Sequence, residues 1–235
     1  MRILVVAATV FEIRPFLEKL HRVGDQDDCL GQYQYKTLHI DVLVPGVGMI
    51  PAAYHLGSQL ATRKYDLAVN AGIAGTYNPE IRLGTVVNIT EDCVPELGAE
   101  DRDKFLSIFE LGLADPDSPP YTAGKLVNNP DTNTLLAKLD IIRNLPRVRA
   151  ITSNTVRGNS ESIERIRRIT DADLESMEGA AFFYACMTKK VPCLQIRSVS
   201  NLIEERDRSR WNLDLALKNL NSILMEIFIS IAAEG

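Results

Sequence analysis

The feature that most constrains the fold is a regular alternation between short apolar runs and segments with helical spacing. The β-branched run Arg2–Ala8 is typical of a buried strand, and the next segment repeats apolar residues from Phe11 to Leu20 at helical spacing. Similar pairs recur along the chain up to a closing helix, whose apolar stripe runs from Leu213 to Ile231. Alternating strands and helices of this kind predict a three-layer α/β/α sandwich with a mixed, largely parallel central sheet.

Three segments in the middle of the chain are predicted as follows. A short buried strand is expected over Leu67–Asn70, and a turn over the glycine-rich stretch Ala71–Gly75. Between Glu91 and Pro120 the apolar periodicity fades while prolines and acidic residues accumulate, so we expect an irregular insertion there. A helix is expected over about Asp131–Leu139. The 235 residues therefore fit one domain, 1–235, with an insertion at about 91–120.

The composition argues against a nucleic-acid-binding protein. With 46% hydrophobic and 24% charged residues, the chain has the composition of an ordinary globular protein. Its net charge is −5, whereas proteins that bind nucleic acids usually carry a basic face. The densest cationic cluster, Arg165, Arg167 and Arg168, is interpreted as the solvated face of a helix.

The cysteines and histidines show no metal-ligand spacing, so no metal site is expected. They are Cys29, Cys93, Cys186, Cys193, His21, His39 and His55. Cys186 and Cys193 lie in apolar surroundings typical of reduced core thiols, which favours a cytoplasmic location. The uncharged stretch Val42–Thr62 has the length of a membrane span, but its prolines and glycines break it into strand, turn and helix. We therefore expect no association with a membrane.

Polar residues and glycines follow the predicted strands at four points, where open α/β sheets bind ligands. These points are Glu12, the turns Gly46–Gly48 and Gly72–Gly75, the segment Glu175–Gly179, and Ser200–Asn201. Each also has a purely structural interpretation: Glu12 suits the first turn of a helix, Ser176 a helix cap, and Ser200–Asn201 a turn. Pro51 stands where a dinucleotide fingerprint has its third glycine, so no dinucleotide cofactor is expected.

The joint order of these motifs resembles the nucleoside phosphorylase and nucleosidase family over nearly the whole chain. Its most specific pieces are Met177–Glu178 and Arg197–Asn201. Within the family, similarity is greatest to the futalosine hydrolases, which release hypoxanthine from a nucleoside with an aromatic carboxylate tail in menaquinone biosynthesis. The segments that carry this similarity are Pro45–Pro51, Asn70–Gly75, Ser200–Asn201, Glu205–Arg208 and Trp211. The resemblance implies a nucleoside phosphorylase-like fold, hydrolysis of a 6-oxopurine nucleoside without a cofactor, and a homodimer or larger homo-oligomer.

The chemistry of ribosyl cleavage agrees with the resemblance. Cleavage creates oxocarbenium character at C1′ and negative charge on the purine. Glu12 fits activation of water and would repel a phosphate dianion, which favours hydrolysis over phosphorolysis. Glu178 fits the sugar hydroxyls, and Met177 fits an apolar surface against the ribose. Asn201 fits a 6-oxopurine, because its N–H can donate to O6 while its carbonyl accepts from N7–H.

Two of the candidate positions depart from the adenosine-type members of the family. Those enzymes have aspartate in place of Asn201 and a small hydroxyl residue in place of Ile73. The other binding residues that the resemblance implies are Val47, Gly72, Arg197, Ser200, Arg206 and Trp211.

Three alternative functions remain open. The chain could be a 6-oxopurine nucleoside phosphorylase or a methylthioadenosine/S-adenosylhomocysteine nucleosidase. It could also be a nucleoside-binding regulatory protein, since a fold alone does not fix function. Phosphate dependence of base release distinguishes a phosphorylase from a hydrolase, and tight nucleoside binding without turnover would favour the regulatory protein.

Overall fold

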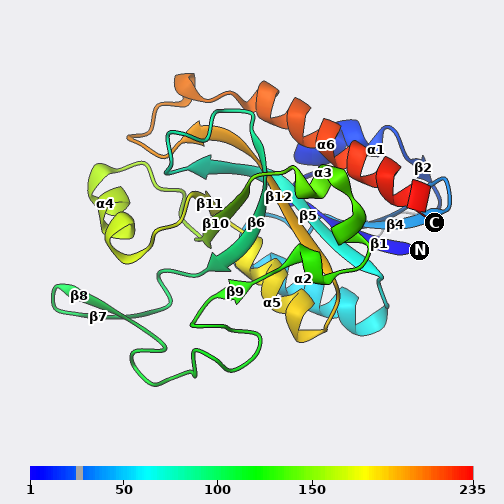
Figure 1. Cartoon of the computed structure of the whole chain (residues 1–235). Helices are drawn as coiled ribbons and strands as arrows, with labels where there is room; N and C mark the ends of the chain where they lie inside the picture. Colours follow the sequence, from blue (N-terminus) through cyan, green and yellow to red (C-terminus); the bar gives the residue numbers. More distant parts are fainter. Residues whose placement is uncertain (25–28, 235) are drawn as a thin grey trace.

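Figure 1 shows the computed structural model, which describes residues 1–24 and 29–234. Its helices are α1 (Val10–Leu17), α2 (Met49–Thr62), α3 (Asp140–Arg143), α4 (Ser160–Ile169), α5 (Gly179–Thr188) and α6 (Leu213–Glu234), with short 3₁₀ helices η1 (Pro130–Thr132), η2 (Leu136–Lys138) and η3 (Arg208–Arg210). Its strands are β1 (Arg2–Val6), β2 (His21–Arg22), β3 (Leu30–Tyr35), β4 (Leu38–Leu43), β5 (Leu67–Thr76), β6 (Val86–Cys93), β7 (Gly98–Asp101), β8 (Lys104–Ser107), β9 (Leu126–Val127), β10 (Arg147–Thr152), β11 (Leu174–Ser176) and β12 (Cys193–Leu202).

The main sheet has the strand order β11-β10-β6-β12-β5-β1-β4-β3-β2, and β9 pairs with β6. Strand β5 lies at its centre and pairs in parallel with both β1 and β12. Strand β11 also pairs with β5, in antiparallel orientation, so that β5, β12, β6, β10 and β11 form a closed ring of strands. Within this ring, the ends of strands that are far apart in the sequence lie close together in space.

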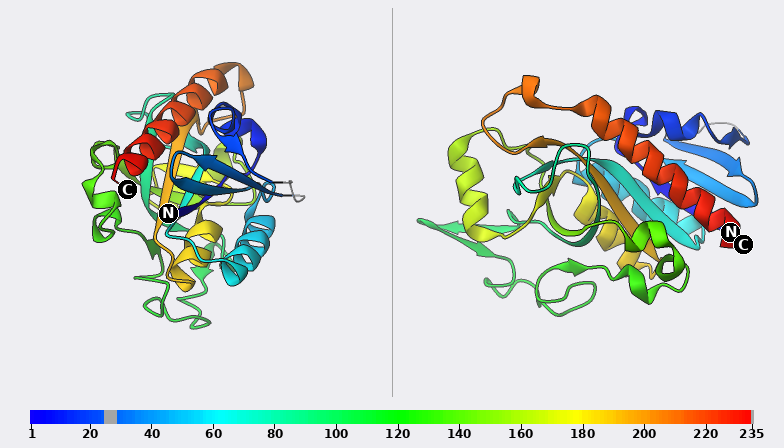
Figure 2. Two further views of the ribbon diagram at one scale, coloured as in Figure 1. Left: turned by 90° about the vertical axis from the view of Figure 1, so that its right-hand side faces the viewer. Right: turned by 45° about the horizontal axis from the view of Figure 1, so that its top comes forward.

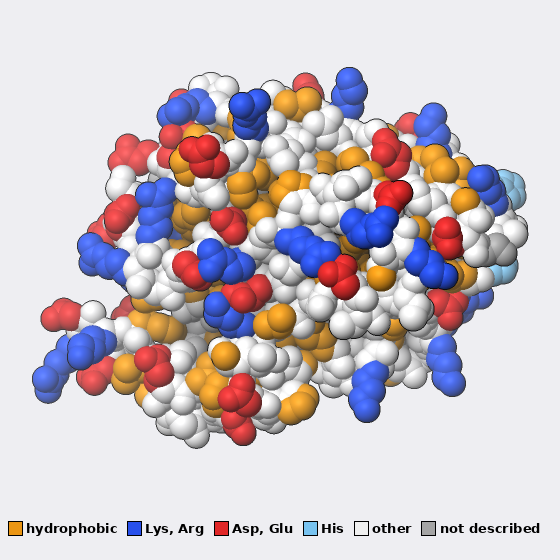
Figure 3. Space-filling view, viewed as in Figure 1, with side chains coloured by type: hydrophobic (Ala, Val, Ile, Leu, Met, Phe, Trp, Pro, Cys, Tyr) orange, Lys and Arg blue, Asp and Glu red, His pale blue; other side chains and the backbone are white. Residues whose placement is uncertain are grey.

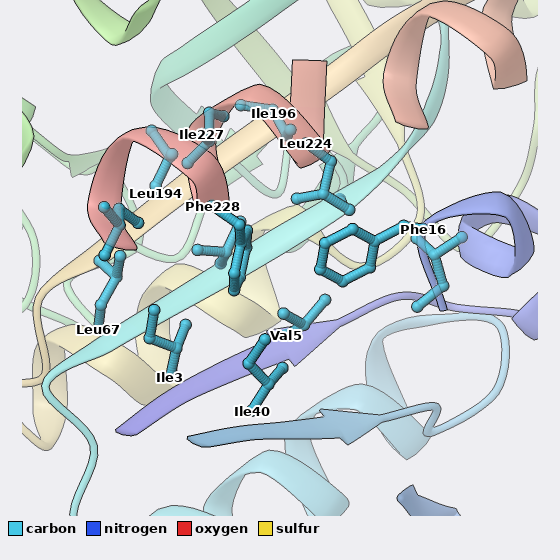
Figure 4. Close-up of a cluster of buried hydrophobic side chains, with 14 of the residues drawn as sticks. Ile3, Val5, Phe16, Ile40, Leu67, Leu194, Ile196, Leu224, Ile227 and Phe228 are labelled. Atoms are coloured by element: carbon cyan, nitrogen blue, oxygen red, sulfur yellow. The ribbon is translucent and has the colours of Figure 1, made fainter. Parts of the chain in front are cut away.

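Helices cover both faces of the sheet, so the predicted three-layer α/β/α sandwich is confirmed. Helices α1 and α6 lie on one face, and α2 and α5 lie on the other (Figures 1 and 2). In the first of three apolar cores, Phe16 of α1 stacks against Phe228 of α6 with ring centroids 4.9 Å apart (Figure 4). Phe182 and Phe183 of α5 belong to the second core. Each layer is therefore held by its own apolar cluster.

Helix α6 matches the predicted closing helix. By length and composition it could span a membrane, with a mean hydropathy of 1.4, and it is the one such helix in the described part of the chain. Leu220, Leu224, Ile227 and Ile231 are nevertheless fully buried against the sheet. The apolar stripe of α6 is thus a core face of the protein.

The structure differs from the sequence expectations in three places. Ala71–Gly75 continues strand β5 instead of forming a turn. The segment Asp131–Leu139 holds parts of two 3₁₀ helices instead of one α-helix, because the side chain of Asn133 accepts hydrogen bonds from the backbone N–H groups of Leu135 and Leu136 and starts a new turn. Finally, Glu91–Cys93 still belongs to β6, so the insertion begins after it.

The insertion projects from the body of the protein and contains a hairpin of β7 and β8 (Figures 1 and 2). Its following loop returns to the body, where Phe109 and Tyr121 stack edge to face. On the face seen in Figure 3, acidic and basic side chains are intermixed around small hydrophobic areas. The insertion therefore lies beside α2 and α5, close to the edge of the sheet that carries the candidate residues.

Candidate active site

The predicted site residues gather at the carboxyl ends of β1, β5, β11 and β12. These ends lie on one edge of the sheet because β1, β5 and β12 run parallel to one another. Strand β11 meets β5 there through the pairing of Glu175 with Gly75. On the other side of β5, Asn201 pairs with the same glycine. This edge of the sheet thus carries residues that are as far apart in the sequence as positions 12 and 212.

Glu12 is buried in the first turn of α1, where three protein donors hold its carboxylate. Oε2 accepts from the backbone N–H of Thr9 at 3.0 Å and from its hydroxyl at 3.2 Å. Oε1 accepts from the backbone N–H of Ile73 at 3.1 Å. A Cβ atom at Gly72 would lie only 2.8 Å from Oε1, so this glycine makes room for the carboxylate. Glu12, Gly72 and Ile73 therefore form one fixed unit.

Glu178 lies at the N-cap of α5 and reaches across to the start of α2. Its Oε1 accepts from the backbone N–H of Gly48 at 2.7 Å, and its side chain is buried. Burial raises the pKa of Glu178, while the Gly48 hydrogen bond and Arg197 oppose the increase and Glu12 adds to it. Val47, next to this contact, is 55% exposed, and Met177 is partly buried. Val47 and Met177, the sequence neighbours of the Gly48–Glu178 hydrogen bond, thus lie in the same region of the site as Glu12.

Arg197 on β12 supplies the positive charge between these carboxylates. It is 2% exposed, and its guanidinium donates to the side-chain oxygen of Asn70 and to the carbonyl of Ile196. Burial lowers the pKa of Arg197, and the negative charges of Glu178, Glu12 and Asp92 oppose that decrease. Asn70 in turn donates to the carbonyl of Val6 at 3.0 Å. A buried, fixed guanidinium therefore balances part of the acidic charge of the site.

Ser200 and Asn201 lie at an irregularity of β12, where the register with β5 shifts after Val199. The Ser200 hydroxyl donates to the Asn201 side-chain oxygen at 2.8 Å, and the Asn201 amide donates to the carbonyl of Leu202 at 2.9 Å. A Cβ atom at Gly75 would lie 3.1 Å from the Asn201 amide nitrogen. One N–H and one acceptor lone pair of Asn201 remain to pair with a ligand. The Ser200–Asn201 segment is therefore part of the strand and does not form the alternative turn.

Arg206 and Trp211 lie in the loop that follows β12. The guanidinium carbons of Arg206 and Arg208 lie 5.5 and 5.9 Å from the centre of the Trp211 ring. The loop is fixed at both ends, since the Arg206 N–H donates to the Gly158 carbonyl and the Asn212 N–H donates to the Ser200 carbonyl. Among the described residues no hydrogen bond or ion pair joins Arg206 or Trp211 to Glu12 or Glu178, so the structure shows no direct polar contact between these two groups of predicted residues.

Several residues of this edge were missed by the sequence reasoning. Asn154 accepts from the backbone N–H of Met49 at 3.1 Å and so fixes the start of α2 beside Gly48. Arg157 forms ion pairs with Glu175 and Glu96, and Tyr77 donates to Glu175 at 2.6 Å. Asn154 and Arg157 follow strand β10, so the same rule of polar residues after a strand applied there could have found them.

No metal-binding cluster was found at this edge or elsewhere among the described residues 1–24 and 29–234. The acceptors and donors of the site are carboxylates, amides, one buried guanidinium and backbone groups. Such groups can orient a sugar and a purine by hydrogen bonds and can accept a proton from water.

Comparison with known proteins places this arrangement in a family. The model of the Phosphorylase superfamily matches residues 2–229. The futalosine hydrolase of Streptomyces coelicolor is 32% identical over 186 residues, which cover 77% of this chain and 74% of that protein. The futalosine hydrolase of Thermus thermophilus is 29% identical over 209 residues, 88% of this chain and 86% of that protein.

Solved structures show the same fold at lower sequence identity. The 5′-methylthioadenosine/S-adenosylhomocysteine nucleosidase of Colwellia psychrerythraea in complex with adenine has a TM-score of 0.80 at 19% identity, covering 98% of this chain and 96% of that one. A futalosine hydrolase mutant of Helicobacter pylori has a TM-score of 0.78 at 16% identity, covering 97% and 99%. The match over residues 2–229 shows that the chain belongs to the phosphorylase superfamily.

Proposed function

We propose that the protein hydrolyses the N-glycosidic bond of futalosine and releases hypoxanthine. Relatives named futalosine hydrolase, 29–32% identical to this chain, support the reaction class and the substrate. Nucleosidases named for methylthioadenosine and S-adenosylhomocysteine are 24% and 27% identical, which makes that alternative weaker. The preference for a 6-oxopurine rests on Asn201.

One observation favours hydrolysis over phosphorolysis. At this edge of the sheet, carboxylates accept the hydrogen bonds of two backbone N–H groups. The N–H of Gly48 is taken by Glu178, and the N–H of Ile73 is taken by Glu12. A phosphate dianion would need such donors and would lie beside two carboxylates, whereas a neutral water molecule meets no such repulsion. Water is therefore the better nucleophile for this site than phosphate.

The reaction follows from these positions. Glu12 accepts a proton from water as the water oxygen bonds to C1′, and the C1′–N9 bond breaks with its electron pair leaving on the purine. The departing base takes up one proton from a water molecule, and Glu12 releases the proton it accepted to solvent, so that the net reaction consumes one water molecule. Glu178 accepts hydrogen bonds from vicinal ribose hydroxyls, and Met177 packs against the sugar. Asn201 donates to O6 and accepts from N7–H of the hypoxanthine product.

The direct test is chromatography of the purified protein with futalosine, inosine and methylthioadenosine, each with and without phosphate. We expect hypoxanthine from futalosine at a rate that phosphate does not change. Base release that requires phosphate would show a phosphorylase, and release of adenine from methylthioadenosine as the fastest reaction would show the adenosine-type nucleosidase. Tight binding of all three without products would show a regulatory protein.

A carboxylate tail on the substrate would find two free cations in the loop after β12. Arg206 and Arg208 each lie over the Trp211 ring, and neither has a carboxylate within ion-pair distance among the described residues. We expect Arg206→Gln to raise KM for futalosine about fivefold and to leave inosine cleavage unchanged. Arg210→Gln is the matched control, because Arg210 lies in the same loop but pairs with Glu204. Equal effects of Arg206→Gln on both nucleosides would contradict a tail clamp.

The proposal includes a homodimer formed through the outer face of α2. Ile50 and Tyr54 on this face are 79% and 71% exposed. They adjoin an apolar cavity of about 470 Å³ between α2, α5 and the insertion, which Met49 and Tyr184 help to line. Burying such a surface against a second copy would remove it from water.

The substitution Ile50→Lys is expected to convert the dimer to a monomer, because it would place a charge in the buried interface. Sedimentation equilibrium measures the mass directly. Ile229→Lys on α6, 43% exposed, is the control and should remain dimeric. A monomeric wild-type protein would contradict the proposal.

We also propose a cytoplasmic location, which the buried, reduced thiols of Cys186 and Cys193 support.

A further inference from the structure

A second polar cluster lies inside the protein, beneath the start of α5. It consists of Asp92 on β6, Thr152 on β10, Ser176 on β11 and Gln195 on β12. Asp92, Thr152 and Gln195 have no exposed surface, and Ser176 is 6% exposed. Buried polar groups are costly unless they find partners, so a cluster of this kind needs a physical reason.

Asp92 is connected to the segment that carries Glu178 through a single hydroxyl group. The Thr152 hydroxyl donates to Asp92 Oδ1 at 2.9 Å. The same hydroxyl oxygen accepts from the backbone N–H of Ala180 at 2.7 Å. Ala180 lies in the first turn of α5, of which Glu178 is the N-cap. A shift of the Asp92 carboxyl group would therefore move the Thr152 hydroxyl and, with it, the start of this helix.

The other oxygen of Asp92 lies near two polar atoms that have no hydrogen-bond partner. Gln195 Nε2 donates to Asp92 Oδ2 at 3.3 Å, but Gln195 Oε1 and the Ser176 hydroxyl have no partner. A Cβ atom at Gly179 would lie 2.2 Å from Gln195 Oε1, 2.3 Å from Asp92 Oδ2 and 3.0 Å from the Ser176 oxygen. Three oxygens thus converge beneath Gly179. The Ser176 hydroxyl carries its own hydrogen, but Gln195 Oε1 can only accept. An ionised Asp92 has no hydrogen to offer Gln195 Oε1, whereas a neutral carboxyl group has one.

Few charges face Asp92 from the surrounding elements. Arg197 on β12 is the cation that acts on it, and burial raises the pKa of Asp92 to about 7 against the opposing effects of Thr152, Gln195 and Arg197. The elements around it carry further titratable groups. Glu91 and Cys93 lie on its own strand, and Lys125 before β9 pairs with Glu91. Arg147 and Arg149 on β10 pair with Asp131 and Asp171, Glu175 on β11 pairs with Arg157, and α5 carries Tyr184, Cys186 and, at its N-cap, Glu178.

We propose that Asp92 is a positioning residue that acts in its neutral form, donating its proton to Gln195 Oε1 beneath Gly179 and so holding Glu178 in place for the ribose. This inference rests on the proposed nucleosidase function. Loss of the proton leaves Gln195 Oε1 buried without a donor and adds a third carboxylate around Arg197, which already serves Glu12 and Glu178. Both effects disturb the start of α5 and weaken the hold on the sugar.

The test is the pH profile of kcat/KM for wild type and Asp92→Asn. The amide of the variant keeps an acceptor for Thr152 and permanently supplies a donor where the carboxyl proton would be. We expect kcat/KM of the wild type to fall at least fivefold between pH 7 and pH 9, and that of Asp92→Asn to change less than twofold. Glu91→Gln, the neighbouring carboxylate on the same strand, should keep the wild-type profile. An alkaline decline that Asp92→Asn retains in full would overturn the inference.

Thermal unfolding provides a readout that does not depend on catalysis. Because the pKa of Asp92 is about 7 in the folded protein and near 4 in the unfolded chain, the folded protein binds the additional proton between these values. Its contribution to stability therefore falls as pH rises from about 4 to about 7 and is constant above. The Tm of Asp92→Asn relative to wild type should increase over the same range, and a constant difference would contradict the inference.

Infrared spectroscopy decides the question if Asp92→Asn does not fold. The C=O band of a neutral carboxyl group should be present at pH 6, lost by pH 8 and kept in Glu178→Gln, because Glu178 is the other carboxyl group here whose pKa burial raises. Absence of the band at pH 6, or its loss in Glu178→Gln, would overturn the inference. These two measurements separate the proposals. A protein that cleaves no nucleoside but shows the band and the Tm trend would contradict only the proposed function. An active hydrolase that shows neither would contradict only the role of Asp92.

Discussion

Replacing Glu12 by glutamine is expected to lower kcat for futalosine at least ~10²-fold, with KM changed little. Glutamine has nearly the same size but cannot accept the proton from water, and the loss of a general base typically costs two or more orders of magnitude. In free energy this is about 2.7 kcal/mol of transition-state stabilisation. Steady-state kinetics with hypoxanthine release as the readout measures the effect.

The glutamine amide also faces the donors Thr9 and Ile73, so Glu12→Gln must be shown to be folded before its rate is interpreted. Circular dichroism and Tm give that check. Glu18→Gln is the matched control, because Glu18 caps the other end of the same helix and is exposed. It should retain wild-type turnover. A folded Glu12→Gln protein with near-normal kcat would show that another group activates water.

The second large effect is expected for Asn201→Asp, which reverses the hydrogen-bond polarity presented to the base. The ionised side chain would offer an acceptor to O6 of hypoxanthine, and its second oxygen would face the Leu202 carbonyl that now accepts from the amide. The same carboxylate can accept from the 6-amino group of adenine. We expect the ratio of kcat/KM for 6-oxopurine over 6-aminopurine nucleosides to fall ~10-fold or more, about 1.4 kcal/mol.

This comparison needs nucleosides with the same 5′ group, such as inosine and adenosine, so that contacts to the tail cancel. Asn212→Asp is the matched control. Its side chain is exposed and accepts from the backbone N–H of Leu215, which aspartate can also do, so the same charge is added eleven positions further along the chain. An unchanged ratio in a folded Asn201→Asp protein would show that Asn201 does not read the base.

The glycine-rich stretch of β5 shows why the sequence predicted the site better than the backbone around it. Glycines usually signal a turn, but Gly72 pairs with Arg197 of β12, and Gly75 pairs with both β12 and β11. They are needed there because the side chains of Glu12 at Gly72, and of Ile203 and Asn201 at Gly75, approach the strand too closely for a Cβ atom. A local rule cannot recognise such a glycine, because the partners that crowd it are distant in the sequence.

The buried polar partners illustrate the same limit. Asp92 lies in the segment that the sequence predicted to be an irregular insertion, and Gln195 lies in a run typical of an ordinary strand. Asp92 meets Thr152 and Gln195 only through the pairings of β6 with β10 and β12. Glu12, Glu178 and Asn201 could be selected from the sequence because each follows a strand and matches a family motif. Their roles remain predictions, while their proximity to Arg197 and Gly75 required the folded sheet.

The central position of β5 also bears on when the protein can begin to work during its synthesis. Its neighbours are β1, some sixty residues earlier, and β12, whose Arg197 pairs with Gly72. Contacts this distant form slowly because the long intervening loops must be closed first. Moreover, a ribosome has to release Asn201 before the strand beside β5 can be added. The nascent chain therefore carries Glu12 through most of the synthesis that precedes Asn201, whereas Glu178 is added only shortly before it. The pocket is incomplete until Asn201 has been released.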